Sequence, residues 1–597
     1  MSKNYCVGID LGTTNNVLAF AATSEDDASV ELLGIPQLVS PGTVETRSSL
    51  PSFHYAPAES EQTSGAFDLP WASDNDFVVG EYARRRSAEA PDRVVSAAKS
   101  WLCHGKVDRH ADILPWQAPK DVAKVSPVEV SRRFIAHLVG AWEANFPDAP
   151  LAEQHVALTV PASFDAAARE LTREAALAAG LPNDLILLEE PQAAIYAWLH
   201  QAGDSWRKQA NAGDRILVCD VGGGTTDLTL VSVEDEAGDL TLKRIAVGDH
   251  LLVGGDNMDL ALAHRASQLF ADKGVKLDPW QSVSLWHACR GAKEQLLTAD
   301  APDSHSVSVL GRGSKLIGGT VTVDLPRTAT EETLLDGFFP DCEIDNAPQR
   351  QRTSGFQEIG LPYESDPAIT KHIAAFLTRH GEDEPVCPSR VLVNGGVFKS
   401  AKIAARLLSV IDSWFGEDVS YLQSDPDLDH AVAKGAAFYA QSKQQGGIRI
   451  RGGTARSYYV GIESSGLAIP GLPRPLRALC VVPFGMEEGS SVEVPSTEVG
   501  VVVGEPAQFR FFSSPSRKQD APGDLLPGVD DEELAETDPL ETTLEQSDDS
   551  EETFVPVSFE ANVTELGMLE LWCRHAESDR RWKLEFSVRD DVAEESQ

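Results

Sequence analysis

Two short stretches of this sequence combine an acidic residue, glycine and paired threonines, the residue types that hold phosphate groups. They are VGIDLGTTN, from Val7 to Asn15, and CDVGGGTTD, from Cys219 to Asp227. Glycines at a sharp turn let several backbone N–H groups point into one space, and such a nest binds anions without the lysine of a Walker A loop. The threonine hydroxyls add further donors. Both stretches therefore indicate a site for a polyphosphate.

An aspartate ends the apolar run in each stretch, Asp10 in the first and Asp220 in the second. A carboxylate repels phosphate, but it holds a hydrated Mg²⁺ ion that binds phosphate oxygens. An ordinary β-turn explains either copy alone, whereas it poorly explains two copies in matching order. The repeat favours two related lobes that face one Mg²⁺–nucleotide across a cleft. The last residue of the second copy, Asp227, is expected to face away and brace the turn.

Two further segments fit the same cleft. In LLEEPQAAIYAW, Glu190 precedes Pro191, and the residue before proline is biased away from α geometry. Its carboxylate is expected at a strand-to-helix junction that opens into a cleft, although Glu-Glu-Pro alone is more often a solvated helix start. In VNGGVFKS, Gly395 and Gly396 let a flat base approach the backbone, and Lys399 is expected to lie along that base.

Composition excludes several classes of partner. The chain has 597 residues and a net charge of −41. It therefore lacks the basic surface that proteins use to bind nucleic acids and anionic membranes. No run of about 18 apolar residues predicts a membrane span, and the N-terminus has no apolar signal core. Eight cysteines occur without a CxxC pair, so neither zinc nor a disulfide framework is indicated. A cytoplasmic location is expected.

The pattern of elements changes along the chain. Residues 1–445 alternate strand and helix patterns, which predicts α/β architecture. Residues 446–457 are glycine-rich and predict a linker. In residues 458–597, apolar and polar residues alternate with period two, which predicts a β domain with one face exposed to solvent. The acidic segment 515–553 is expected to be a disordered insertion or a long loop.

Local patterns predict two elements in detail. SFDAAARELTREAALAAGL is expected to be a helix that Ser163 or Asp165 caps and that Gly180 ends. FVPVSFEANV is expected to be a strand with one apolar face. The residues on that face are Val555, Val557, Phe559 and Ala561.

Together and in this order, these segments resemble the nucleotide-binding domain of the seventy-kilodalton heat-shock (DnaK-like) chaperone family. The resemblance covers most of residues 5–440 and is most specific in TVPASFDAAARELTREAALAAGL followed by EEPQAA. It identifies a divergent bacterial-type member. It implies a two-lobed actin-like and sugar-kinase-like ATPase domain followed by a β-sandwich domain that binds polypeptide.

The resemblance also implies ATP or ADP and Mg²⁺ as cofactors, and a role for each site residue. Asp10 and Asp220 hold Mg²⁺, and Glu190 and Thr225 orient the attacking water. The residues implied to hold the phosphates are Gly12, Thr13, Thr14, Asn15, Gly222, Gly223, Gly224, Thr225 and Thr226. Those implied to surround the nucleoside are Gly255, Asp256, Arg290, Lys293, Gly395, Gly396 and Lys399.

Three positions depart from the family pattern. Arg84 stands where the family has a catalytic lysine, so turnover is expected to be weak or to use Arg85 or Arg86 instead. Arg290 stands where the family usually has a glutamate that contacts ribose. Lys399 stands where it usually has an arginine that packs on adenine.

The C-terminal part resembles the family only faintly, and an unrelated β-sandwich stays an alternative. GIRIRGG replaces the family's acidic-apolar leucine linker, and the chain ends shortly after Arg589, so no helical lid is expected. We hypothesise that the acidic segment 515–553 shields the β domain.

The function that the resemblance implies is ATP hydrolysis by a chaperone that acts on unfolded or extended polypeptides, with co-chaperones as further partners. One alternative is a nucleotide-gated scaffold with little hydrolysis, which the Arg84 substitution and the changed linker keep open. The other is a small-molecule kinase of the same fold, although no additional substrate site is evident in the sequence.

Overall fold

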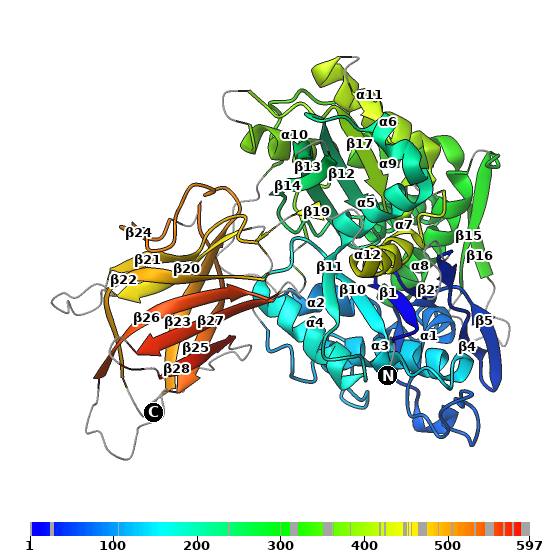
Figure 1. Cartoon of the computed structure of the whole chain (residues 1–597). Helices are drawn as coiled ribbons and strands as arrows, with labels where there is room; N and C mark the ends of the chain where they lie inside the picture. The colour runs from blue at the N-terminus through cyan, green and yellow to red at the C-terminus, as the bar shows by residue number, and fades with distance from the viewer. Residues whose placement is uncertain are drawn as a thin grey trace.

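The computed structural model contains a two-lobed α/β domain with a β-sandwich domain beside it (Figure 1). The structure describes residues 3–23, 29–105, 107–236, 239–298, 300–310, 320–349, 361, 363–381, 384–416, 419–422, 426–445, 450–451, 453–454, 456–463, 475–487, 489–502, 506–530, 533–543, 554–564, 568–575, 578 and 580–586. Among these residues, no helix is long and apolar enough to cross a membrane. The predicted fold class is confirmed.

Lobe I is built on a sheet that contains the first predicted turn. Its strands, in spatial order, are β11 (Ile186–Glu189), β10 (His155–Val160), β1 (Tyr5–Leu11), β2 (Asn15–Ala22) and β3 (Glu31–Leu32), with β6 (Leu50–Pro51) also paired to β2. Strand β1 pairs antiparallel with β2 and parallel with β10. Its side chains alternate between two cores: Val7 and Ile9 pack into one and Cys6 into the other.

Lobe II repeats this connectivity. Its strands are β18 (Ser420–Tyr421), β17 (Arg390–Asn394), β12 (Arg215–Val221), β13 (Thr226–Glu236), β14 (Asp239–Val247) and β19 (Ile450–Arg451). Strand β12 pairs antiparallel with β13 and parallel with β17, as β1 does with β2 and β10. The repeat seen in the sequence therefore corresponds to a repeated sheet topology.

Helices cover the faces of both sheets. In lobe I they are α1 (Glu81–Arg86), α2 (Ala98–Leu102), α3 (Pro127–Asn145) and α4 (Ala166–Ala178). In lobe II they are α6 (Trp206–Gln209), α7 (Gly255–Asp272), α8 (Pro279–Leu296), α9 (Arg327–Phe338), α10 (Ile369–Arg379) and α11 (Ala401–Phe415). Helix α4 begins as predicted, because the Asp165 carboxylate accepts a hydrogen bond from the Ala168 N–H at 2.8 Å.

Small strands complete the two lobes. They are β4 (Ile35–Ser40), β5 (Thr43–Arg47), β7 (His54–Tyr55), β8 (Val78–Val79) and β9 (Val94–Val95) in lobe I, and the hairpin of β15 (Ser304–Leu310) and β16 (Thr320–Pro326) in lobe II. Strand β7 pairs with both β8 and β9. These strands lie outside the two main sheets.

Helices α5 (Glu190–Ala202) and α12 (Ala431–Gln445) pack against each other between the two sheets. Helix α5 buries Ile195 and Trp198 against strands of lobe II, and α12 buries Ala433 and Ala437 against β2 of lobe I. The contact between the helices depends on glycine, because a Cβ at Gly435 would lie 1.8 Å from the Ala193 carbonyl oxygen. The helix pair thus fixes the two lobes at a common base.

In the part of the C-terminal domain that the structure describes, nine strands form a single run. In spatial order these are β22 (Ser490–Val502), β26 (Phe554–Val563), β27 (Leu569–His575), β28 (Arg581–Phe586), β25 (Ala535–Thr543), β23 (Pro506–Ser514), β20 (Ser457–Glu463), β21 (Leu476–Val482) and β24 (Leu525–Leu526). Val555, Val557 and Phe559 are buried in the core as the alternation predicts. This burial confirms the β-sandwich.

The expectation of a disordered insertion or a long loop over residues 515–553 is wrong for residues 535–543, which form β25. Strand β25 pairs with both β23 and β28, so it lies inside the sheet. The sequence suggested disorder because residues 520–553 contain no basic residue, but cations from outside that segment pair with several of its acids. Residues 544–553 lie outside the described residues.

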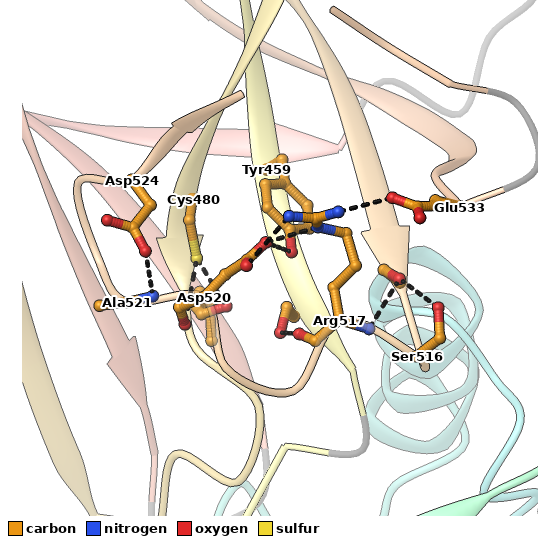
Figure 2. A network of polar contacts seen from close by, with 11 residues as sticks. Tyr459, Cys480, Ser516, Arg517, Asp520, Ala521, Asp524 and Glu533 are labelled. Atoms are coloured by element: carbon orange, nitrogen blue, oxygen red, sulfur yellow. Dashed lines mark hydrogen bonds and ion pairs between the residues drawn. The ribbon is translucent and has the colours of Figure 1, made fainter. Parts of the chain in front are cut away.

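Arg517 is a cation that pairs with two of these acidic residues (Figure 2). Its guanidinium donates to Asp520 at 2.6 Å and to Glu533 at 2.5 Å. The Tyr459 hydroxyl donates to the same Asp520 carboxylate at 2.7 Å. Two acids and one cation therefore fix the loop after β23 against β20.

The two domains make specific contacts. Arg109 of lobe I and Asp538 of β25 form an ion pair at 2.5 Å, with side chains only 1% and 8% exposed. The Lys518 ammonium donates to the Ile245 carbonyl of β14 at 2.9 Å. Met568 packs into the lobe I core. Within the predicted linker 446–457, β19 pairs parallel with β14 and so extends the lobe II sheet.

A buried histidine makes the stability of lobe I depend on pH. His137 of α3 donates from Nε2 to the Pro36 carbonyl at 2.9 Å, and burial lowers its pKa from 6.5 to about 4. As pH falls below 6.5, the unfolded chain binds a proton that the folded chain excludes. Between these two pKa values, His137 should lower the free energy of unfolding by about 1.4 kcal/mol for each pH unit of acidification.

The His137→Gln variant tests this expectation, because its amide also donates a hydrogen bond but does not titrate. Denaturant midpoints of both proteins at about pH 7.5 and about pH 5 give the comparison. The variant should lose less stability on acidification than the unchanged chain. Equal losses would contradict the role of His137.

Candidate functional site

The two predicted turns have the same backbone hydrogen bond. Between β1 and β2, the Gly12 N–H donates to the Asn15 carbonyl at 3.1 Å. Between β12 and β13, the Gly222 N–H donates to the Thr225 carbonyl at 2.9 Å. Each lobe therefore presents one glycine turn at the end of the equivalent hairpin.

The turns approach each other so closely that glycine is required on the lobe II side. A Cβ at Gly223 would lie 2.0 Å from the Thr14 hydroxyl oxygen, and one at Gly224 would lie 2.8 Å from a Thr13 methyl carbon. Beside this contact is a cavity of about 360 Å³ between the lobes. Its volume lies in the range of small-molecule sites.

Most of the predicted site residues line this cavity. They are Asp10, Gly12, Thr13, Thr14, Asn15, Glu190, Asp220, Gly222, Gly223, Thr225, Gly255, Asp256, Arg290, Lys293, Gly395, Gly396 and Lys399. Gly224, Thr226 and Arg84 do not line it. Thr226 is buried and donates its hydroxyl proton to the Val253 carbonyl at 2.8 Å, so it shapes the turn from behind.

Each aspartate is braced by the residue opposite it on the parallel neighbouring strand. Asp10 is in register with Thr159 of β10, whose hydroxyl donates to it at 2.9 Å. Asp220 is in register with Asn394 of β17, whose amide donates to it at 2.8 Å. The duplication therefore extends to the hydrogen bonds that orient the two carboxylates.

The floor of the cavity concentrates negative charge. Burial raises the pKa of Asp220 to about 7 and that of Glu190 to about 8, and it also raises the pKa of Asp10. Carboxylate oxygens are the ligands that Mg²⁺ prefers. Among the described residues, no three acidic, histidine or cysteine side chains form a metal-binding group. Asp10 and Asp220 fit an ion that keeps most of its water ligands.

Lys99, which the sequence interpretation missed, is the cation on this floor. It lies in α2, lines the cavity and donates to the Glu190 carboxylate. Burial opposes its charge, but Glu190 and Asp10 outweigh burial and raise the pKa of Lys99 above its ordinary value. The sequence feature that could have indicated Lys99 is its position as a single lysine inside the apolar run VVSAAKSWL.

The expectation that Arg84 lies in the site is corrected by its position. Its guanidinium pairs with Glu81 at 2.7 Å, and its side chain is 45% exposed. The neighbouring Arg85 pairs with the same Glu81, and Arg86 pairs with Glu61. The buried Glu81 carboxylate attracts both Arg84 and Arg85, and none of the three arginines lines the cavity.

The other end of the cavity has an apolar lining. It is formed by Leu297, Val397, Ile403 and Leu428, which suit the faces of a nucleobase. Lys399 is not free there, because it pairs with Asp429. Arg290 is held by Asp256 and by Asp259, the latter at 3.0 Å. The sequence did not indicate Asp259, Asp429 or the apolar lining, because no motif marks them.

Comparisons with known proteins find similar sequences for part of the chain. Residues 69–316 match the family described as Hsp70 protein. The chain is 29% identical over 336 residues to a chaperone protein HscA homolog of Acinetobacter baumannii, a match that covers 54% of this chain and 45% of that relative. It is also 29% identical over 311 residues to the HscA homolog of Bordetella petrii, covering 50% of this chain and 43% of that relative.

The chain thus aligns with slightly less than half the length of these curated relatives. The region that matches the family lies inside the two-lobed domain, between the two duplicated turns and beyond the second. The matches show that part of the chain is similar to Hsp70 proteins, and both relatives named above are bacterial proteins.

Proposed function

We propose that this chain is a Mg²⁺-dependent ATPase whose nucleotide state controls how the β-sandwich domain holds an extended polypeptide. The observation that carries the proposal is the duplicated turn with its braced aspartate, one copy in each lobe. Two N–H-rich turns and two buried carboxylates around one cavity suit a nucleotide polyphosphate with its metal ion. The similarity to Hsp70 proteins also supports the proposal of a nucleotide site.

The residues of the cavity have distinct roles in this proposal. The Gly223 N–H and the other free N–H groups of the two turns donate to phosphate oxygens, whereas the N–H groups of Gly12 and Gly222 close the turns. Asp10 and Asp220 hold the Mg²⁺ ion, which when bound neutralises charge on the phosphates. Glu190 and Thr225 orient the attacking water. No covalent intermediate is needed, because positioning and charge stabilisation supply the catalysis.

Lys99 takes the catalytic position that the sequence interpretation gave to Arg84. Its ammonium lies at the Glu190 carboxylate and close enough to Asp10 to interact with it electrostatically. A buried cation beside the place where phosphate charge develops stabilises that charge. Lys99 also keeps the Glu190 carboxylate in a fixed orientation.

Two features support a role for the β domain in polypeptide binding. Strand β22 is at one edge of the nine-stranded sheet and, among described residues, pairs only with β26. An open edge binds extended chains through backbone hydrogen bonds. Strand β19, which leads into the β domain, is paired with β14 of lobe II, so movement of lobe II reaches the β domain directly.

An ATPase assay with and without a permanently unfolded polypeptide tests the proposal on the full chain. Turnover that rises when the polypeptide is added is expected. Nucleotide binding without hydrolysis in either condition would favour a nucleotide-gated scaffold. ATP consumption that requires a metabolite would favour a small-molecule kinase.

A matched pair of substitutions separates Lys99 from Arg84. Lys99→Ala should slow single-turnover ATP hydrolysis by about 10²-fold, because it removes a buried charge-stabilising donor. Arg84→Ala removes only a half-exposed ion pair, so its rate should stay within about twofold. The roles proposed for the two residues would be refuted if Arg84→Ala abolished hydrolysis and Lys99→Ala did not.

A second pair tests the base end of the cavity. Gly395 has a φ of 91°, and a Cβ there would lie 2.3 Å from the Val221 carbonyl oxygen. Gly395→Ala should therefore weaken ATP binding by at least about tenfold through displacement of the turn. Gly291→Ala in α8 is the control, since a Cβ there meets no atom within 4 Å. Equal affinities of both variants, measured by calorimetry, would contradict this role.

A further inference from the structure

A second polar cluster, formed by Ser163, Asp227 and His250, lies behind the phosphate turn of lobe II. Ser163 follows β10 in lobe I, whereas Asp227 is in β13 and His250 follows β14 in lobe II. None of the three lines the cavity. Ser163 and Asp227 are only 6% and 3% exposed. A buried polar cluster that crosses between lobes, outside the cavity, needs a function of its own.

The three side chains form a directed chain of hydrogen bonds. The Ser163 hydroxyl donates to the Asp227 carboxylate at 2.5 Å, and it lies 2.7 Å from His250 Nδ1. Because the hydroxyl has one proton, Nδ1–H must be the donor to the serine oxygen. His250 Nδ1 is also 3.8 Å from the same carboxylate oxygen. The serine of lobe I therefore lies between a donor and an acceptor of lobe II.

The surroundings of His250 and Asp227 favour a charged pair on the lobe II side. Burial favours neutral imidazole, but the Cys103 thiol and the Asp227 carboxylate outweigh it and raise the pKa of His250 to about 10. Hydrogen bonds to charged groups are stronger than those between neutral groups. The Phe164 ring packs edge-on against His250, with centroids 5.8 Å apart.

The backbone around His250 connects the cluster to the phosphate turn. Leu251 accepts a hydrogen bond from the Thr226 N–H at 2.9 Å. Four residues further on, the Gly255 N–H donates to the Gly222 carbonyl at 3.0 Å. A displacement of the segment 250–255 would therefore move the turn that faces the cavity.

We propose that Ser163, Asp227 and His250 form a latch that holds the two lobes closed on a bound nucleotide and sets the rate at which nucleotide leaves. These are positioning residues, because they contact the turn from behind and do not reach the cavity. This inference rests on the proposed nucleotide function. It assigns Asp227 a role distinct from that of the metal-binding Asp220.

Ser163→Ala tests the latch, because it removes the two hydrogen bonds that Ser163 makes across the lobes and changes the side-chain volume little. Dissociation of a fluorescent ADP analogue (MANT-ADP) from the full chain should become about tenfold faster. Single-turnover hydrolysis of ATP should stay within about twofold, because the serine does not touch the reacting groups. A slowed chemical step with unchanged release would overturn the proposal.

Ser131→Ala is the matched control. Ser131 is as deeply buried, but its hydroxyl donates within α3 to the Pro127 carbonyl at 3.0 Å, so no cross-lobe bond is lost. Its release rate should match that of the unchanged chain. Equal acceleration in both variants would show a general loss of stability and would overturn the latch.

Asp227→Asn removes the charge of the side chain and keeps its shape. Together with Ser163→Ala and the double variant, it forms a double-mutant cycle. If the two side chains act as one latch, the double variant should release MANT-ADP little faster than Ser163→Ala alone. Additive effects would overturn the cluster as a unit.

Amide hydrogen exchange supplies a readout that needs no nucleotide. Segments 161–166 and 248–252 should exchange faster in Ser163→Ala, whereas in Ser131→Ala they should exchange as in the unchanged chain. Unchanged exchange would overturn the latch. Failure of the unchanged chain to bind MANT-ADP would instead contradict the proposed function, and hydrogen exchange would still decide whether the cluster holds the lobes together.

Discussion

The buried carboxylates at the junction of the two lobes are the constraint on which the rest of the structure depends. Asp10 is partly buried, and Glu190, Asp220 and Asp227 are buried. A buried carboxylate is costly unless it is paired or hydrogen-bonded. Each of the four has a specific partner, and those partners come from strands and helices distant in the sequence. The fold must therefore bring these elements together.

The partners divide into a symmetric and an asymmetric set. Thr159 and Asn394 occupy the same register position in the two lobes, so the duplicated topology alone supplies them. Lys99 and Ser163 have no such relation and both come from lobe I. The first set orients the two aspartates, and the second connects lobe I to the rest of the cleft. A duplicated site thereby gains one cation and one cross-lobe contact that duplication would not provide.

In the β domain, too, acidic residues are held in place by partners that are distant in the sequence. Its acidic segment folds because Arg517 neutralises Asp520 and Glu533, and because β25 is paired on both sides (Figure 2). Asp538 of that strand then pairs with Arg109 of lobe I in a buried contact. A buried ion pair is weak evidence of stability, since desolvation offsets much of its attraction. It does fix the position of one domain against the other.

The sequence by itself determined the features that local chemistry controls. Glycines after apolar runs predicted both turns at the cavity, a cap at Ser163 or Asp165 predicted the start of α4, and the alternation around Val555 predicted a strand of the sandwich. Glycine freedom, helix capping and period-two burial act within a few residues, so one sequence suffices to read them. Most of the residues that line the cavity followed from these loops together with the family resemblance.

Only the tertiary structure decided which charges meet. Lys99 reaches Glu190 across 91 positions of sequence, and Ser163 reaches Asp227 across 64. Arg84 failed to reach the cavity because the buried Glu81 on its own helix attracts it. The order of the described residues 515–530 and 533–543 likewise depended on partners elsewhere in the sheet. Pairing between charges is set by the packing of distant elements, and local residue patterns carry no record of that packing.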